Sequence, residues 1–192
     1  MIWALILAAG ESKRMGRSKQ LLPFENKTIL ETVIDHITQS AVDQILTVLG
    51  AQHKEIEKVI KDLPVKSVYN PNFKEGMLSS AQKGFVSIPE KAEAVLVFLG
   101  DQPRIPSSVI DQVITAYHSS EKGIVVPVYD KNRGHPVLIS TKYREEVTHL
   151  DPEIGLRELI HNHPEDILEV QVDTSAIIED IDTPDDYKNL KH

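Results

Sequence analysis

Hydrophobic and polar positions alternate in blocks along almost the whole chain. Short apolar runs are separated by longer segments in which apolar residues recur at helical spacing. The apolar runs predict buried strands at 2–8, 44–49, 65–69, 94–99, 124–129, 136–140 and 168–172. The segments between them predict helices at about 28–40, 54–62, 77–87, 107–117, 142–148, 155–161 and 184–190.

The repeated order of strand and helix predicts an α/β fold. A sheet of this kind is mostly parallel and covered by helices on both faces, so we expect a Rossmann-like three-layer α/β/α sandwich. Thr28 and Glu31 have the spacing of a capping box, which marks the start of the first long helix. No linker interrupts the pattern, and a single domain over 1–192 is expected. Ligands of such folds bind beyond the carboxyl ends of the strands.

Composition narrows the classes of function. The formal net charge of −8 argues against nucleic-acid binding and against binding to an anionic membrane, because both depend on clustered cations. The 192 residues include no cysteine, which excludes thiol catalysis and cysteine-ligated metals. No apolar run is long enough to span a membrane, and the N-terminal run lacks the features of a secretory signal. We expect a cytoplasmic protein.

The loop after the first predicted strand is the strongest chemical signal. Ala8, Ala9 and Gly10 let backbone N–H groups come close to a ligand. Four cations follow in this otherwise acidic chain: Lys13, Arg14, Arg17 and Lys19. A solvated surface loop is the alternative, but the position directly after a buried strand favours a polyphosphate site. The loop is neither a P-loop, because five residues separate its glycines, nor a dinucleotide fingerprint, because position 12 is serine.

This loop resembles the signature L-A-x-G-x-S-x-R-M-G-x-x-K of the molybdenum-cofactor nucleotidyltransferases, the MobA-like superfamily with its MocA-like cytidylyltransferase branch. The matching residues are Leu7, Ala8, Gly10, Ser12, Arg14, Met15, Gly16 and Lys19. The resemblance implies that Leu7, Ala8, Ala9 and Gly10 line a nucleotide site. It also implies that Arg14 and Lys19 bind the triphosphate, neutralise its charge and act in catalysis.

Asp101 directly follows the apolar run 94–99, in the sequence Gly-Asp-Gln-Pro. A carboxylate at a strand end suits Mg²⁺, which takes one or two carboxylates and completes its shell with phosphates and water. A turn before Pro103 explains the same residue equally well. The resemblance favours the metal, because L-x-D-Q-P is the second motif of the family and its aspartate is a catalytic magnesium ligand.

The segment 178–187 resembles the family's D-I-D-T-P-x-D ending. Pro184 after Thr183 starts a helix well, which accounts for part of this pattern. Alternation along a short strand would place Asp180 and Asp182 on the same side. The resemblance implies that Asp182 is a second metal ligand, and Asp180 is the weaker candidate.

Two further segments resemble the family. Asn70, Gly76 and Ser80 match a segment in which a glycine turn starts a helix, and they imply further nucleotide contacts, although ordinary helix capping also explains them. Gly134 and His135 match an element on the acceptor side, where His135 could meet the acceptor phosphate or be an ordinary loop residue. The segment 150–157 departs from the family pattern beside the acceptor pocket, so the identity of the acceptor stays open.

The expected reaction is attack by an acceptor phosphate on the α-phosphorus of a nucleoside triphosphate, with release of pyrophosphate. Such a nucleophile is already ionised, so no catalytic base is needed and positive charge and Mg²⁺ do the work. Ala9 stands where guanylyl-transferring relatives tend to carry glycine, which favours CTP. The resemblance implies molybdopterin as acceptor and a transient complex with a molybdenum hydroxylase such as xanthine dehydrogenase.

Two alternatives remain open at this stage. The same chemistry could act on a sugar phosphate or a polyol phosphate, since those relatives share the basic loop and the metal aspartate. A protein of another class, a non-catalytic factor that delivers the molybdenum cofactor, could share the fold. Its discriminating observation would be failure to release pyrophosphate.

Overall fold

The structure, a computed structural model, describes residues 1–190. The last two residues of the expected domain 1–192 lie outside that range. The main sheet has eight strands in the order β10-β7-β9-β6-β1-β4-β5, with β8 paired to β7. Its strands are β1 (Ile2–Ala8), β4 (Gln44–Leu49), β5 (Lys66–Tyr69), β6 (Ala94–Leu99), β7 (Ile124–Tyr129), β8 (Asn132–Arg133), β9 (Val137–Ser140) and β10 (Ile167–Gln171).

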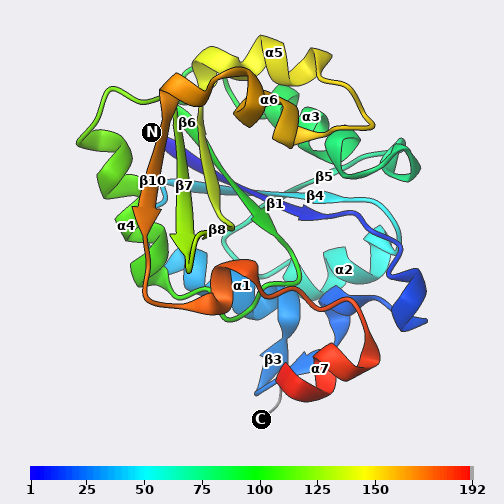
Figure 1. Ribbon diagram of the computed structural model, residues 1–192. Helices are drawn as coiled ribbons and strands as arrows, with labels where there is room; N and C mark the ends of the chain where they lie inside the picture. The colour runs from blue at the N-terminus through cyan, green and yellow to red at the C-terminus, as the bar shows by residue number, and fades with distance from the viewer. Residues whose placement is uncertain (191–192) are drawn as a thin grey trace.

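Helices cover both faces of this sheet (Figure 1), so the expected three-layer α/β/α sandwich is confirmed. One face packs against α1 (Ile29–Thr38), α2 (His53–Ile60) and α4 (Ser107–His118). The other packs against α3 (Met77–Ser87), α5 (Arg144–His149) and α6 (Leu156–Asn162). None of the helices among residues 1–190 combines the length and apolar character that a bilayer-spanning segment requires.

Strand β1 lies at the centre of the sheet, and its side chains contribute to the hydrophobic core on both faces. Ile2, Ala4 and Ile6 pack into one layer, while Trp3 and Leu5 pack into the other. This alternation is the consequence of the two-residue repeat of a strand, and its apolar residues on both sides fit a strand covered on both faces. Helix α1 begins with the predicted capping box of Thr28 and Glu31, which is confirmed.

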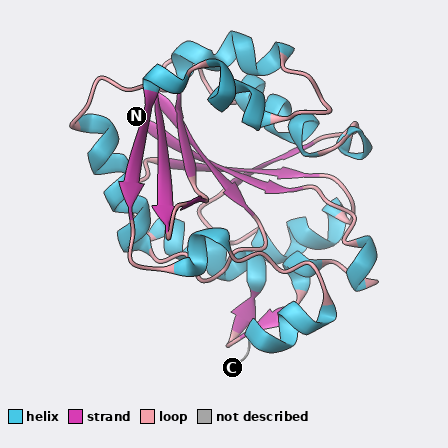
Figure 2. Cartoon of the chain, in the orientation of Figure 1, coloured by secondary structure: helices cyan, strands magenta, loops and turns pink. Residues whose placement is uncertain are grey.

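The sheet is mostly parallel, as predicted, but two of its strands, β8 and β9, are antiparallel to their neighbours. Strand β9 is antiparallel to both β6 and β7, and β8 is antiparallel to β7. The parallel register of β1 pairs Leu7 with Leu99 and Ala8 with Leu49. The carboxyl ends of β4, β1 and β6 therefore lie side by side, and the loops that follow them meet at one edge of the sheet (Figure 2).

A two-stranded hairpin and the last helix pack together beside this edge of the sheet. The two-stranded hairpin β2 (Pro23–Phe24) and β3 (Lys27–Thr28) follows the basic loop. Helix α7 (Pro184–Leu190) packs on it, where Tyr187 donates a hydrogen bond from its hydroxyl to the Pro23 carbonyl at 2.6 Å. Ile181 and Tyr187 pack in one apolar cluster with residues of the hairpin and of the start of α1. This packing brings the C-terminal aspartates next to the N-terminal loop.

Candidate functional site

The loop after β1 is shaped by two residues in the left-handed region of backbone space. Ser12 has φ of 52° and Gly16 has φ of 67°, and a single 3₁₀ turn, Lys13–Met15, lies between them. The Ser12 hydroxyl accepts a hydrogen bond from the Lys19 backbone N–H at 3.1 Å, which closes the loop. Gly10 is exposed, with open space around the position of a side chain. The loop thus presents backbone to solvent and turns the Lys19 side chain inward.

Lys19 is the centre of the charged cluster, which we define as Arg14, Lys19, Asp101 and Asp182. Its Nζ lies 2.7 Å from Asp101 Oδ2 and 2.8 Å from Asp182 Oδ1. Arg14 Nη2 lies 2.7 Å from the other oxygen, Oδ2, of Asp182. Three segments far apart in the sequence therefore meet at the strand ends: the first loop, the loop after β6 and the segment before α7.

Burial and charge set the electrostatics of this cluster. Burial alone would lower the pKa of Lys19, but the carboxylates of Asp101 and Asp182 outweigh it and raise the pKa. The hydrogen bond from Lys19 lowers the pKa of Asp182, and Arg14 adds to that effect. The side chains of Lys19 and Asp101 are each 14% exposed, whereas Arg14 is 70% exposed. The cluster thus has a largely buried centre, Lys19 and Asp101, and an exposed arginine.

The basic loop and Asp101 both lie within the part of the chain that matches a family of known proteins. A model of the MobA-like NTP transferase domain matches residues 4–167. The chain belongs to the MobA-like NTP transferase family. The sequence resemblance is thereby confirmed, and the protein is a nucleotidyltransferase of cytidylyltransferase-like character.

Individual relatives cover nearly the full chain. The molybdenum cofactor cytidylyltransferase of Escherichia coli K12 is 28% identical over 190 residues, which span 97% of this chain and 94% of the relative. The nicotine blue oxidoreductase of Paenarthrobacter nicotinovorans is 26% identical over 201 residues, 98% and 96% of the two chains. The crystal structure of Rv0371c from Mycobacterium tuberculosis superimposes with a TM-score of 0.89 at 28% identity, covering 99% and 96%. A manganese complex of Rv0371c matches with a TM-score of 0.84 at 26% identity, covering 99% and 97%.

The charged cluster of this MobA-like chain has the donor set that a hard divalent cation needs. Among residues 1–190, no group of three or more His, Cys, Asp or Glu side chains is arranged to hold a metal. Asp101 and Asp182 are instead a pair, and a single ammonium contacts both of them. Two carboxylates leave the remaining positions around Mg²⁺ to phosphate and water oxygens. The residues therefore fit a metal that arrives together with a nucleotide.

The predicted nucleotide-binding residues after β5 form a network of their own. Asn70 is buried, and its Nδ2 donates to the hydroxyls of Ser79 at 3.0 Å and Ser80 at 3.1 Å. Its Oδ1 accepts from the Asn72 backbone N–H at 3.0 Å. Gly76 has φ of 105° and precedes the first turn of α3. In this structure Asn70 and Ser80 therefore hold the loop 70–76 against the helix.

The first residues of the loop lie at the end of β1, as the family signature implies. Leu7, Ala8 and Ala9 are buried there, and the Ala9 carbonyl accepts a hydrogen bond from the Ala51 backbone N–H at 3.1 Å. Leu7 also lines a large cavity on the side of the sheet that α3 and α6 cover. The start of the loop thus borders both the charged cluster and that cavity.

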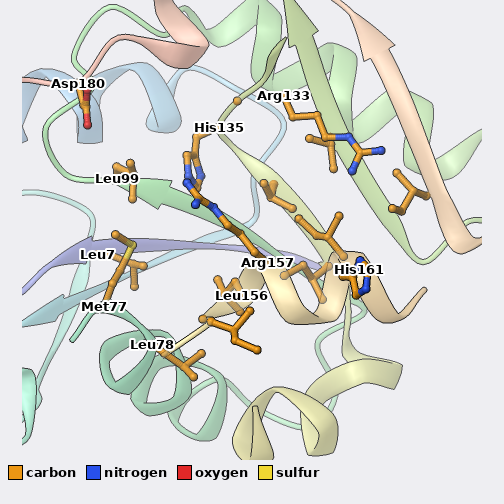
Figure 3. A pocket seen from close by; sticks show the side chains of 18 of the residues that line it. Leu7, Met77, Leu78, Leu99, Arg133, His135, Leu156, Arg157, His161 and Asp180 are labelled. Carbon is orange, nitrogen blue, oxygen red and sulfur yellow. The ribbon is translucent and has the colours of Figure 1, made fainter. Parts of the chain in front are cut away.

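The cavity, about 810 Å³ in volume, also contains the predicted acceptor residues. Gly134 and His135 line it (Figure 3), and a side chain at Gly134 would lie 2.3 Å from the Ile177 carbonyl oxygen. His135 donates its backbone N–H to the same carbonyl at 2.8 Å. The close packing of this turn on Ile177 fixes the position of the imidazole.

The segment around Asp180 corrects one expectation. Residues 179–183 form a loop, where a short strand was expected. They do not pair with the main sheet, and the burial of Ile181 in the apolar cluster of the hairpin and α7 anchors them instead. Asp180 lines the cavity, and burial raises its pKa, with the charges of Asp182 and Asp101 adding to the shift. Asp182 points to Lys19, so the two aspartates face different parts of the site.

Sequence reasoning missed most of the cavity wall. Helix α6 contributes Leu156, Arg157, Ile160 and His161 to it. The helix itself was predicted at 155–161. Arg157 ends the segment 150–157 that departs from the family pattern, and that departure was the one sequence signal that linked this segment to the acceptor pocket.

Proposed function

We propose that this chain transfers CMP from CTP to the phosphate of molybdopterin in the maturation of a molybdenum hydroxylase such as xanthine dehydrogenase. The observation that carries the proposal is the contact of one ammonium, Lys19, with two carboxylates, Asp101 after β6 and Asp182 before α7. The full-length similarity to the molybdenum cofactor cytidylyltransferase of Escherichia coli supports both substrates.

The reaction needs positive charge and alignment. An oxygen of the acceptor phosphate forms a bond to the α-phosphorus of CTP, the bond from that phosphorus to the bridging oxygen breaks, and pyrophosphate leaves. Arg14 and Lys19 bind the triphosphate and neutralise the charge that develops on it. Leu7, Ala8, Ala9 and Gly10 position the nucleotide, with Asn70, Gly76 and Ser80 shaping the opposite wall.

Asp101 and Asp182 would hold Mg²⁺. A bound divalent cation screens the phosphate charges and polarises the phosphorus–oxygen bonds. The manganese complex of Rv0371c supports a divalent cation in this branch of the fold. Lys19 contacts both carboxylates and would hold them together beside the triphosphate.

The preference for CTP rests on Ala9. This residue is buried at the end of β1, where its methyl group leaves less room for a purine than for a pyrimidine. We expect Ala9→Gly to raise the turnover of GTP relative to CTP. Equal turnover of the two nucleotides by the native protein would contradict this part of the proposal.

The test is pyrophosphate release by the purified protein with Mg²⁺. CTP, GTP and ATP are offered in parallel, each with and without molybdenum-loaded molybdopterin. Release only with CTP and the pterin supports the proposal. Release with a polyol phosphate such as 2-C-methylerythritol 4-phosphate would instead favour the sugar or polyol acceptor. Release under none of these conditions would favour a non-catalytic delivery factor.

A further inference from the structure

The cavity reaches the strand ends that precede the charged cluster. Leu7 and Leu99, which are paired at the carboxyl ends of β1 and β6, both line it. Asp101 follows Leu99 by two residues in the sequence. Asp180 lines the cavity, where burial and the charges of Asp182 and Asp101 raise the pKa of its carboxyl group. A molecule in the cavity would therefore place one end next to a nucleotide held by the charged cluster.

The walls of the cavity are largely apolar. They are formed by Leu7, Leu78, Leu99, Val137, Leu156 and Ile160. Met77 of α3 and Ile154 of the loop before α6 also line the cavity, and both are exposed to solvent. An apolar cleft with a few polar groups is typical of a site for a small organic ligand.

Arg157 differs from the other arginine of the cavity. Arg133 is paired with Glu169, with Nε and Nη2 both 2.7 Å from the same carboxylate oxygen. The guanidinium of Arg157 makes no ion pair and no hydrogen bond with any residue in the range 1–190. Figure 3 shows its side chain extending through the cavity toward His135. An arginine without a carboxylate partner in an apolar cleft is available for an anionic ligand group.

The His135 ring is not a donor for an anionic ligand group, so it does not compete with Arg157. Its Nδ1 lies 3.4 Å from the Val97 carbonyl oxygen, so Nδ1 carries the proton and Nε2 is an acceptor in the neutral ring. Burial lowers the pKa of His135, and the Arg157 guanidinium lowers it further against the opposing effects of Val97 and Asp180. A neutral imidazole that accepts at Nε2 cannot donate to a phosphate dianion.

We propose that Arg157 binds the phosphate of the acceptor and that the apolar walls select acceptors whose phosphate is attached to a largely apolar ring system. This inference rests on the proposed function, because it names the residue that would orient the attacking phosphate. It also predicts discrimination against polyol phosphates, whose hydroxyl groups would lose water contacts against leucine and isoleucine without a replacement.

The experiment measures binding in the absence of CTP, so it does not depend on turnover. The probes are 4-methylumbelliferyl phosphate, a flat aromatic phosphate, its alcohol 4-methylumbelliferone, and glycerol 3-phosphate. Each is titrated into native protein, Arg157→Gln and Arg133→Gln, and protein fluorescence or calorimetry reports the dissociation constant. Arg133→Gln is the matched control, because Arg133 lines the same cavity but is neutralised by Glu169.

We expect the native protein to bind the aromatic phosphate at least about tenfold more tightly than either of the other two probes, the equivalent of one charge-assisted contact. Arg157→Gln is expected to abolish the preference for the phosphate over the alcohol, and Arg133→Gln to retain it. Retention of the preference in Arg157→Gln, its loss in Arg133→Gln, or equal binding of glycerol 3-phosphate would overturn the inference. Thermal unfolding verifies that each variant is folded.

The two proposals fail in different ways. If the aromatic phosphate binds through Arg157 but no pyrophosphate is released with any acceptor, the binding site stands and the transferase proposal falls. If CTP-dependent transfer to molybdopterin occurs equally well in Arg157→Gln, the transferase proposal stands and the role of Arg157 falls.

Discussion

The charged cluster and the cavity adjoin each other, yet they are built in opposite ways. In the charged cluster every ionic group already has a protein partner, and Asp101 is placed by the end of β6 while Lys19 is placed by the loop after β1. In the cavity the walls come both from the sheet and from α3 and α6, and Arg157 has no carboxylate partner within residues 1–190. In the proposed function the chemistry thus rests on a preformed ionic cluster, whereas recognition of the acceptor rests on an arginine of α6 that has no carboxylate partner there.

Removal of Asp101 should have the largest effect on the charged cluster. We expect Asp101→Asn to reduce turnover about a hundredfold or more, because loss of transition-state electrostatics of this kind is worth about 3 kcal/mol. Steady-state pyrophosphate release measures the change. Asp185→Asn is the control, because Asp185 is an exposed carboxylate paired only with Lys188 in the same region of the chain. Native turnover in Asp101→Asn would separate catalysis from this cluster.

Arg14 tests whether an exposed member of the cluster serves function without serving stability. Its pair with Asp182 is 70% exposed on the arginine side, and exposed ion pairs add little to the free energy of unfolding. We expect Arg14→Ala to lower kcat/KM for CTP by about ten- to a hundredfold. The midpoint of urea unfolding should stay close to the native value. A large loss of stability with native kinetics would reverse this assignment.

Substitution of Asn70 tests the hydrogen bonds that hold the loop 70–76, which the proposed function places beside the nucleotide. Asn70→Ala removes the donor for two serine hydroxyls and the acceptor for a backbone N–H. We expect the free energy of unfolding to fall by about 1–3 kcal/mol, the usual result of leaving buried polar groups unpaired. The KM for CTP should rise while binding of the aromatic phosphate in the cavity is unchanged. Ser79→Ala is a milder control, since Ser79 is nearer the surface. A native KM for CTP in Asn70→Ala would show that the loop 70–76 is not part of the nucleotide wall.

Substitution of Asp166, which links the turn after α6 to the segment before α5, is expected to give the smallest effect. Its Oδ2 accepts from the Tyr143 hydroxyl at 2.5 Å and lies 2.7 Å from Lys142 Nζ. Burial alone would raise the pKa of Asp166, but these two hydrogen bonds outweigh it and lower the pKa. A carboxylate whose pKa is lower in the folded protein stabilises the fold above its unfolded pKa, and this contribution is lost as the pH falls through the folded value.

We therefore expect Asp166→Asn to reduce the free energy of unfolding by about 1–2 kcal/mol at neutral pH. The difference from the native protein should shrink below about pH 4, near the pKa of an unfolded aspartate. Urea unfolding across the pH range measures it, with the exposed neighbour Glu165→Gln as control. A difference that grows as the pH falls would contradict the sign of the shift.

Prediction from sequence worked best where burial leaves a clear pattern. The strands 2–8, 44–49, 94–99 and 124–129 are observed within the predicted bounds, because each is covered on both faces and consists of nearly continuous apolar residues. The helices 77–87 and 184–190 also match. The hairpin β2–β3 and the short strand β8 were missed, because strands of two residues are too short to show periodicity.

Long-range geometry was not available from the pattern. The antiparallel direction of β9 depends on pairing with β6 and β7, and its residues look like those of any buried strand. Lys19, Asp101 and Asp182 were each singled out, but their direct contact joins positions 82 and 163 residues apart. Arg157 was passed over as a functional residue, since a single arginine on a short helix carries no spacing signal.

The most direct test of the account follows the labelled phosphorus. The purified protein is incubated with Mg²⁺, molybdenum-loaded molybdopterin and CTP labelled at either the α- or the γ-phosphate, and the labelled products are separated. We expect the α-label to appear in a pterin dinucleotide and the γ-label in pyrophosphate. Appearance of the γ-label in the pterin, or of no label in the pterin at all, would contradict nucleotidyl transfer to molybdopterin by this chain.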